Sequence, residues 1–350
     1  MKKVSLTVCI LLLTVCTKVK SQDLHFAQIQ ESPILINPAN TGFFQGYFRA
    51  IAQYRNQWMS MGKPYQTMGL SVDAALFKSR RKAAYLGMGL TIFNDLAGAA
   101  DLGSTQVNLN ISGIVKLNKK SLLSVGVYGG SMSNNGNYNQ LNYASQYNGT
   151  TIDPSLPTGE KVVFHTFTTS DIGAGIAYEF TSTKVDNDRD DIISFKIGAS
   201  AYHLNTPRQE FGTGLGYKLP AKYVFHANMR IDIPKRNVSI LPSVVVFYQA
   251  GAAQYNFGTL IKYRFKNGTK ITGEKFERGL AAGAYYRVND ALIPQVLLDM
   301  GGYAIGLSYD ANISAYQQVS NSVGGFEISL RYNMLADALF KKKSEYGRSK

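Results

Sequence analysis

Hydrophobic and polar positions alternate with a period of two along most of this chain. Residues 303–310 read Tyr-Ala-Ile-Gly-Leu-Ser-Tyr-Asp, and residues 326–332 read Phe-Glu-Ile-Ser-Leu-Arg-Tyr. The segments 172–180, 223–233 and 255–266 repeat the pattern. Successive side chains of a β-strand point to opposite faces of the sheet, so this alternation predicts strands with one apolar face and one polar or small face. We therefore expect an all-β protein.

Two environments produce such strands. In a soluble sandwich the apolar face is the core, whereas in an outer-membrane barrel it meets lipid and the other face lines an enclosed interior. Three features favour the barrel: segments of about ten residues, aromatic residues at the segment ends, and a signal-like N-terminus in a chain with cysteine only at positions 9 and 16. We predict a transmembrane antiparallel β-barrel of the bacterial outer membrane over residues 47–332.

The expected strands are counted from the alternation. They lie near residues 47–58, 66–77, 83–94, 104–117, 121–133, 168–180, 191–204, 223–233, 239–249, 253–266, 277–287, 291–299, 302–311 and 324–332. About 14 strands is an even number, as bacterial single-chain barrels have.

The lengths of the connections predict the orientation. The longest connections, near 134–167, 205–222 and 312–323, are the fifth, seventh and thirteenth. Outer-membrane barrels place long loops outside the cell and short turns in the periplasm. We therefore expect residues 22–46 to be a periplasmic N-terminal segment and residues 333–350 to be a basic periplasmic C-terminal tail.

The first 21 residues have the features of a secretory signal peptide. Two lysines follow Met1, and an apolar run leads to an expected cleavage site near Ser21 and Gln22. A lipoprotein signal at Cys16 is the alternative, although Val15 stands where a small residue is expected. Removal of residues 1–21 takes away four lysines and both cysteines, which lowers the formal charge of +14 by four and leaves no thiol.

Candidate chemistry is sparse. The four histidines share no metal-ligand spacing, so we expect no metal, no cofactor and no catalytic residue. Positive residues are scattered rather than gathered in a stripe, which argues against nucleic acid and favours outer-membrane lipid or a partner protein. An outer-membrane hydrolase that depends on one Ser/His pair, such as His165 with Ser170, remains a rival class.

Charged residues on the polar faces of the expected strands are predicted to face the lumen. They are Asp171, Glu179, Arg230, Asp232, Arg287 and Arg331, together with Asp310 and Glu327. A charge at these positions is tolerated when it is hydrated or paired, whereas the same charge facing lipid costs about 2–4 kcal/mol. Two interpretations stay open: an interior plugged by salt bridges, or a polar conduit.

Short motifs at the two ends of the chain are more specific. The N-terminal part carries His25, Phe26, Gln28, Asn37, Pro38, Tyr54, Arg55, Gln57 and Trp58, and the C-terminal part carries Tyr309, Asp310 and Glu327. In this order the motifs resemble the PorP/SprF family of outer-membrane proteins of type IX secretion and gliding. Departures from the family pattern are Ala27 in place of Ser, Gly306-Leu307 before Ser308, and Phe326 in place of His.

The resemblance implies a non-enzymatic barrel. Its expected role is to assist export or surface anchoring of a large secreted or adhesin-type protein, or to link the outer membrane to periplasmic type IX secretion and motor components. The motif residues are then either structural or partner-binding. The alternative function is a passive porin or small-solute channel.

Overall fold

The computed structural model describes residues 26–58, 63–79, 82–98, 100–136, 141–159, 166–185, 190–210, 216–266, 277–314 and 323–334. The signal peptide predicted over residues 1–21 and the tail beyond Met334 lie outside these ranges. Among the described residues, no helix is long and apolar enough to cross a membrane.

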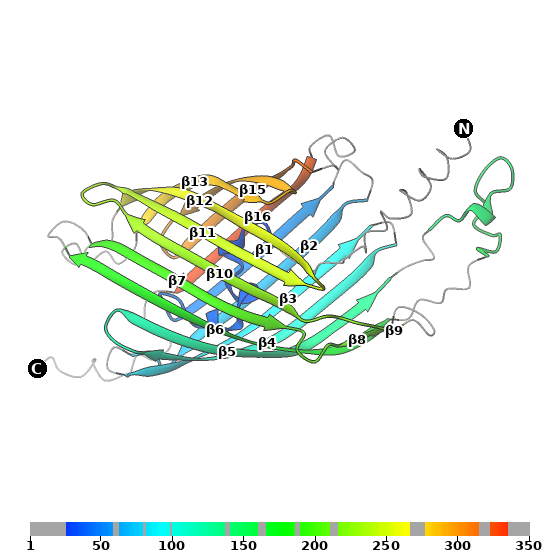
Figure 1. The fold of residues 1–350 in the computed structure, drawn as a ribbon. Coiled ribbons are helices and arrows are strands. Elements are labelled where there is room, and N and C mark those ends of the chain that lie inside the picture. Colours follow the sequence, from blue (N-terminus) through cyan, green and yellow to red (C-terminus); the bar gives the residue numbers. More distant parts are fainter. Residues whose placement is uncertain are drawn as a thin grey trace, which may run out of the picture.

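The described strands close into one antiparallel barrel (Figure 1). Its wall consists of β1 (Phe48–Gln57), β2 (Tyr65–Leu76), β3 (Ala84–Ala97), β4 (Leu102–Lys116), β5 (Ser121–Asn135), β6 (Phe167–Val185), β7 (Asp190–Tyr202), β10 (Lys222–Asp232), β11 (Val238–Gln249), β12 (Ala252–Lys266), β13 (Arg278–Arg287), β14 (Ala291–Asp299), β15 (Tyr303–Asn312) and β16 (Val323–Met334). Neighbours in the chain pair with each other, and β1 pairs with β16 from Phe48↔Met334 to Gln57↔Gly325. The predicted fold class and strand number are confirmed.

The wall has an apolar outer face and a polar inner face. Leu86, Met88, Leu90 and Ile92 of β3 are exposed on the outside, while the residues between them are buried. Aromatic pairs lie near both ends of the strands, such as Trp58 with Tyr65 at one end and the stacked rings of Phe180 and Phe195 at the other. This is the arrangement that a lipid-facing barrel needs.

The two ends of the barrel differ. One end, called the loop end here, carries the long connections 136–166, 203–221 and 313–322. The hairpin of β8 (Arg208–Glu210) and β9 (Gly216–Lys218) lies in the second of these connections. The other end, called the turn end, carries the shorter connections 77–83, 117–120 and 233–237 and the last residue of β16 (Figure 1). The connection 267–277 between β12 and β13 lies at the turn end and is longer than 313–322, so the expected grouping at one end holds for the two longest connections.

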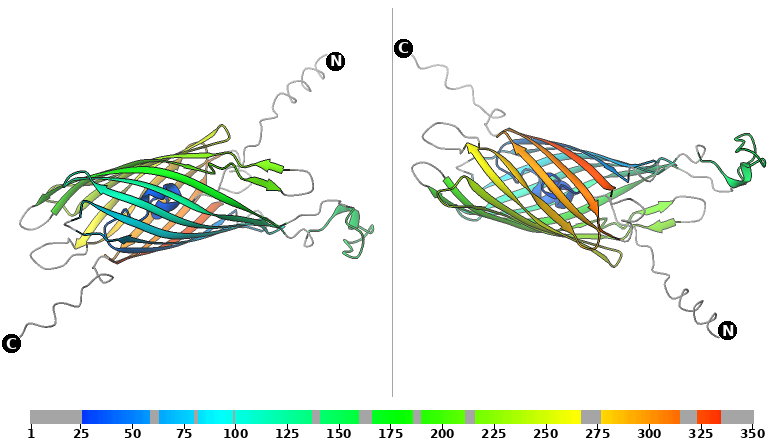
Figure 2. Two further views of the ribbon diagram at one scale, coloured as in Figure 1. Left: turned by 90° about the horizontal axis from the view of Figure 1, so that it is seen from below. Right: turned by 90° about the horizontal axis from the view of Figure 1, so that it is seen from above.

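The expectation of a periplasmic segment at residues 22–46 is wrong for the described part of it. Residues 26–46, called the plug here, lie inside the barrel (Figure 2). They form three short turns of helix: η1 (Ile29–Glu31), α2 (Pro33–Ile36) and η2 (Pro38–Asn40). Their side chains are mostly buried against the inner wall, which gives the lumen a core of its own.

Candidate functional site: the filled lumen

The plug crosses the lumen from the loop end toward the turn end. Phe26 packs against Phe93 with ring centroids 6.2 Å apart, on the half of β3 nearer the loop end. Phe43 lies beside Lys196 of β7, nearer the turn end. The backbone N–H of Tyr47 then donates to the Met334 carbonyl at the start of β1 (2.9 Å).

A buried carboxylate holds the first residues of the plug. Both oxygens of Glu327 on β16 accept backbone N–H groups, from Ala27 at 2.7 Å and from Gln28 at 3.0 Å. The Gln28 side chain donates to the Glu327 carbonyl (3.0 Å) and accepts from the hydroxyl of Ser329 (2.6 Å). Four hydrogen bonds thus join Ala27 and Gln28 to Glu327 and Ser329, which makes this a firm attachment of the plug to the wall.

Asn37 makes the central attachment. Its side-chain amide donates to the carbonyls of Ile176 (2.9 Å) and Ala199 (3.2 Å), and lies 3.2 Å from Nε2 of His226. Its Oδ1 accepts from the N–H of Ala39 (2.9 Å), which caps η2. Pro38 occupies the first position of η2, where its missing N–H costs nothing.

Hydroxyl groups of the wall satisfy the carbonyl groups of the plug. The acceptors lie on Ile34, Ile36, Ala39 and Thr41, and their donors are Tyr202 (3.0 Å), Ser200 (2.7 Å), Ser124 (2.6 Å) and Ser112 (2.5 Å), respectively. Buried backbone groups without partners are costly, so a short irregular segment can lie in this interior only because the wall supplies donors.

Glycines of the wall make room for the plug. A Cβ at Gly126 of β5 would lie 2.5 Å from backbone atoms of Pro38 and Ala39, and one at Gly87 of β3 would lie 2.1 Å from the Thr41 carbonyl oxygen. Any other residue at these positions forces the plug backbone to move.

Cations fix the plug near the turn end. Asp73 of β2 accepts the N–H of Gly42 (2.7 Å) and both Nε and Nη2 of Arg49 (2.9 and 2.8 Å). Lys196 donates to the Phe43 carbonyl (2.7 Å) and pairs with Glu179 (2.9 Å).

Lys78, which follows β2, completes the attachment. Its ammonium group donates to the carbonyls of Phe44 (2.6 Å) and Gly46 (3.0 Å). Burial lowers the pKa of Lys78 to about 8, with Lys196, Lys116 and Arg49 adding to the effect and Glu179 opposing it. The last residues of the plug are thus held by a cation that water only partly reaches.

The other lumenal charges are paired across strands. Asp310 on β15 accepts from Arg55 of β1 (2.9 Å) and Arg287 of β13 (2.8 Å). Arg331 of β16 pairs with Glu31 of the plug (2.6 Å). The pairs of Arg55 and Arg287 with Asp310 are almost fully buried, whereas the Arg331 side chain is 21% exposed. Such burial is tolerable only because each charge has a close opposite partner.

A second set of paired charges lies on the opposite side of the barrel. Asp232 of β10 accepts from Arg230 (2.9 Å) and Arg264 (3.3 Å). Arg230 also reaches Glu277 (2.5 Å). Nearer the loop end, Asp171 accepts the hydroxyl of Tyr128 (2.7 Å) and lies 3.0 Å from Nδ1 of His203. Of the charges predicted to face the lumen, Glu179, Arg230, Asp232, Arg287, Arg331 and Asp310 take part in ion pairs inside the barrel. Asp171 accepts a hydrogen bond from Tyr128, and Glu327 accepts backbone N–H groups of the plug.

The motif residues divide into two groups. Phe26, Gln28, Asn37 and Pro38 belong to the plug, and Arg55, Asp310 and Glu327 belong to the wall that binds it or to the ion pairs around it. Tyr54, Gln57, Trp58 and Tyr309 lie on the outer face or at the loop-end rim, where Tyr309 is 40% exposed. His25 lies outside the described residues. The motif residues of the plug and of the inner wall therefore lie where the plug is attached to the barrel.

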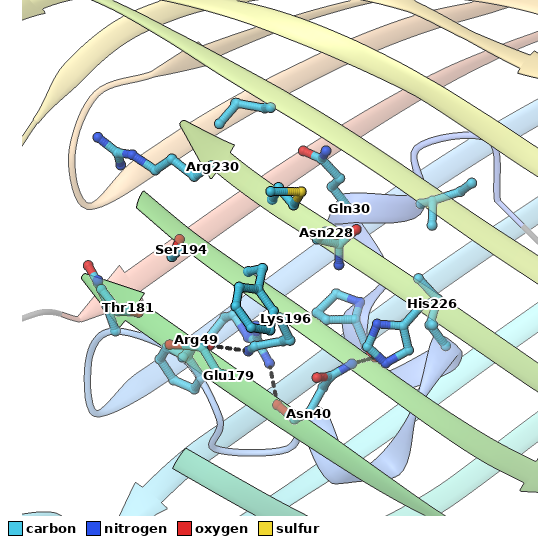
Figure 3. Close-up of a pocket in the computed structure, with 18 of the residues that line it drawn as sticks. Gln30, Asn40, Arg49, Glu179, Thr181, Ser194, Lys196, His226, Asn228 and Arg230 are labelled. Carbon is cyan, nitrogen blue, oxygen red and sulfur yellow. Dashed lines mark hydrogen bonds and ion pairs between the residues drawn. The ribbon is translucent and has the colours of Figure 1, made fainter. Parts of the chain in front are cut away.

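A cavity of about 360 Å³ remains between the plug and the wall. Gln30, Asn40, Arg49, Lys196 and Arg230 line it, together with Glu179, Thr181, Ser194, His226 and Asn228 (Figure 3). Its walls carry both signs of charge, already engaged in the pairs above. Among the described residues, no group of three or more His, Cys, Asp or Glu side chains has a geometry that could hold a metal ion.

The attachment residues Asp73, Ser112, Ser124, Lys78 and Lys196 were not singled out from the sequence. The only signal was that Asp73 and Lys196 interrupt largely apolar strands, on faces that alternation assigns to the lumen. Their partner, the plug, could not be placed in the lumen from local pattern.

The protein is a β-barrel of the outer-membrane type. Its barrel is closed, its outer face is apolar, its interior is polar and buried, and its own N-terminal segment fills the lumen. A family model described as type IX secretion system membrane protein PorP/SprF matches residues 18–332. The chain belongs to this family.

Solved structures resemble the barrel at low sequence identity. The CymD monoaromatic hydrocarbon channel is 11% identical with a TM-score of 0.43, covering 87% of this chain and 94% of the channel. The P. putida toluene transporter TodX is 12% identical (TM-score 0.42; 87% and 94% covered), and BamA from Haemophilus ducreyi is 8% identical (TM-score 0.42; 82% and 70% covered). No curated protein matches the sequence.

Proposed function

We propose that this protein is a non-enzymatic outer-membrane barrel that serves type IX secretion by holding a partner protein. The partner is a large exported or surface-anchored protein, such as a gliding adhesin, at one end, or the periplasmic secretion and motor components at the other. The observation that carries the proposal is the filled lumen. A barrel whose interior is occupied by its own segment acts through its two ends rather than through a passage.

The plug argues against the alternative of a passive porin. A porin needs a water-filled channel, whereas here the segment from Phe26 to Gly46 is attached to strands all around the wall. The ion pairs Arg55–Asp310 and Arg331–Glu31 also lie inside the barrel, the second of them between the wall and the plug. A lumen that holds such an attached segment is a poor fit to a passive porin.

The described part of the interior gives no support to a hydrolase, and His165 of the expected His165/Ser170 pair lies outside the described residues. The closest arrangement to a catalytic relay is His203 with Asp171, and the hydroxyl that joins them belongs to Tyr128, which donates to Asp171 rather than to the imidazole. A nucleophile must lie within reach of a base that accepts its proton. This cluster instead stabilises the wall where Tyr202 of β7 donates to the plug carbonyl of Ile34.

The loop end offers the surface for an exported partner. The connection between β5 and β6 projects from the barrel (Figure 1) and includes η5 (Ala144–Gln146) and the bridge Tyr147↔Ile152. Buried Gln146 folds this part by bonding to Tyr143 and Leu156 (3.1 Å each), while Tyr147 is 56% exposed. An aromatic on a small, internally bonded loop is well suited to protein recognition.

Gene deletion tests the proposal. The deletion strain should lose one or more type IX cargo proteins from its surface, or lose gliding, and a plasmid copy should restore them. A copy that lacks residues 141–159 should insert normally but fail to restore surface display if the partner binds the loop end. Full surface display of every cargo with intact motility in the deletion strain would refute the role.

A further inference from the structure

We propose that one side of the turn end is a binding surface for the headgroups of anionic phospholipids. The described residues of two neighbouring connections form it: residues 77–79 and 82–83 between β2 and β3, and residues 117–120 between β4 and β5. Because β3 pairs with β4, these connections lie side by side. The inference rests on the membrane-spanning barrel and does not depend on which partner the protein serves in secretion.

The charge of these two connections is of one sign. They read Phe-Lys-Ser-Arg-Arg-Lys-Ala and Leu-Asn-Lys-Lys, with six cations and no acid in eleven residues. The next turn-end connection, 186–189 between β6 and β7, contains two aspartates, and 233–237 between β10 and β11 contains only two cations, Lys235 and Arg236. The β2–β5 side therefore carries the largest one-signed cluster among these connections. A one-signed cluster at a membrane surface attracts anionic lipid.

The cations of this region divide into two groups with different tasks. Lys78 is turned to the plug carbonyls, and Lys116 donates to the Ser79 carbonyl (2.6 Å). Lys82, Lys119 and Lys120, called the basic edge here, are exposed, and none has an acidic partner among the residues that the structure describes. The basic edge is therefore available for an anion from outside the chain.

Apolar side chains at the same level place this surface at the membrane. Phe77 and Leu117 are 55% and 54% exposed, and the ammonium group of Lys82 lies 5.4 Å from the Phe77 ring centroid. Next along the strands, Leu86 and Val115 are exposed on the lipid-facing wall. A lysine at the edge of an apolar belt packs the aliphatic part of its side chain over the belt and places its ammonium group in the headgroup layer. An acidic protein would not need the exposed apolar residues, so a phospholipid is the better fit.

Lipid binding to the purified, folded full-length protein tests the inference. Native mass spectrometry should show preferential retention of dioleoylphosphatidylglycerol over dioleoylphosphatidylcholine. The variant Lys82→Gln, Lys119→Gln, Lys120→Gln should lose this preference, with phosphatidylglycerol affinity falling by about 100-fold, since each lysine near a membrane surface contributes about 1 kcal/mol.

A matched variant controls for net charge. Lys63→Gln, Arg208→Gln, Lys218→Gln removes three cations at the loop end and should keep the wild-type lipid preference. Equal loss in both variants, no preference in the wild-type protein, or abolition of phosphatidylglycerol retention by inorganic phosphate at matched ionic strength would overturn the inference. If the basic-edge variant fails to fold, Lys119→Gln alone should still reduce affinity by about fivefold.

Discussion

Substitution of one wall glycine should weaken the docking of the plug. In Gly126→Ala, the new methyl group would lie 2.5 Å from the carbonyl carbon and oxygen of Pro38 and from the nitrogen of Ala39. These are backbone atoms and cannot rotate away. The plug backbone must retreat by about 1 Å to reach an ordinary contact, which also stretches the hydrogen bond from Ser124 to the Ala39 carbonyl, now 2.6 Å long.

The cost can be estimated from overpacking in well-ordered cores. Extra methyl groups at such places cost about 1–3 kcal/mol, so the population of the docked plug relative to displaced states should fall by about 5- to 150-fold. Gly129→Ala is the matched control, because Gly129 lies on the same strand and a methyl group there would have no other atom within 4 Å. It should leave the barrel unchanged.

Planar-bilayer conductance measures the outcome directly. The wild-type protein and Gly129→Ala should show little or no steady current, whereas Gly126→Ala should open transient or steady conductance and lower the urea midpoint of unfolding. Identical traces and midpoints for the two alanine variants would mean that the plug does not lie against β5, and the reasoning would fail.

Three further predictions concern single side chains. Asn37→Ala should lower the free energy of unfolding by about 1–3 kcal/mol in urea titration, because two wall carbonyls lose their donor; an unchanged midpoint would contradict the central attachment. Lys78 should react with amine acylating reagents with a midpoint near pH 8, and a midpoint near 10.5 would show that the lysine is not buried. The free energy of unfolding should rise between about pH 8 and 10.5, because over this range the lysine keeps its proton in the unfolded chain but loses it in the folded protein. Leu307→Arg, in the middle of the lipid face of β15, should cost about 2–4 kcal/mol in vesicle refolding, against about 0–1 kcal/mol for Tyr303→Arg at the strand end; equal costs would argue against the assigned membrane depth.

The wall of this barrel is predictable from sequence because its signal is local. Each strand carries its own alternation, and the strand from Ala291 to Asp299 has the predicted bounds. β6 differs more, because it runs to Val185, five residues beyond the expected end. Apolar and polar residues no longer alternate after Phe180, although the pairing with β7 continues.

The plug is not predictable in the same way because its partners are remote. Gln28 and Glu327 are 299 residues apart, and Asn37 reaches carbonyls 139 and 162 residues further on. The segment has no strand or long-helix period, so its polarity indicated an exposed flank. The sequence carries one indirect sign of the plug. Gly87 and Gly126 occupy inward positions of the wall, where a lumen without a plug would not require glycine.

Cross-linking of the plug to the wall is the most direct test of the filled lumen. The side-chain oxygens of Ser32 and Gln53 lie 2.8 Å apart, and the chain beyond residue 21 has no native cysteine. Ser32→Cys with Gln53→Cys should be joined by a short bifunctional thiol reagent in intact membranes, and the barrel should then resist plug displacement. Ser32→Cys with Leu70→Cys, whose second site faces outward, should not be joined. Failure of the first pair, or equal linking of both, would contradict the filled lumen.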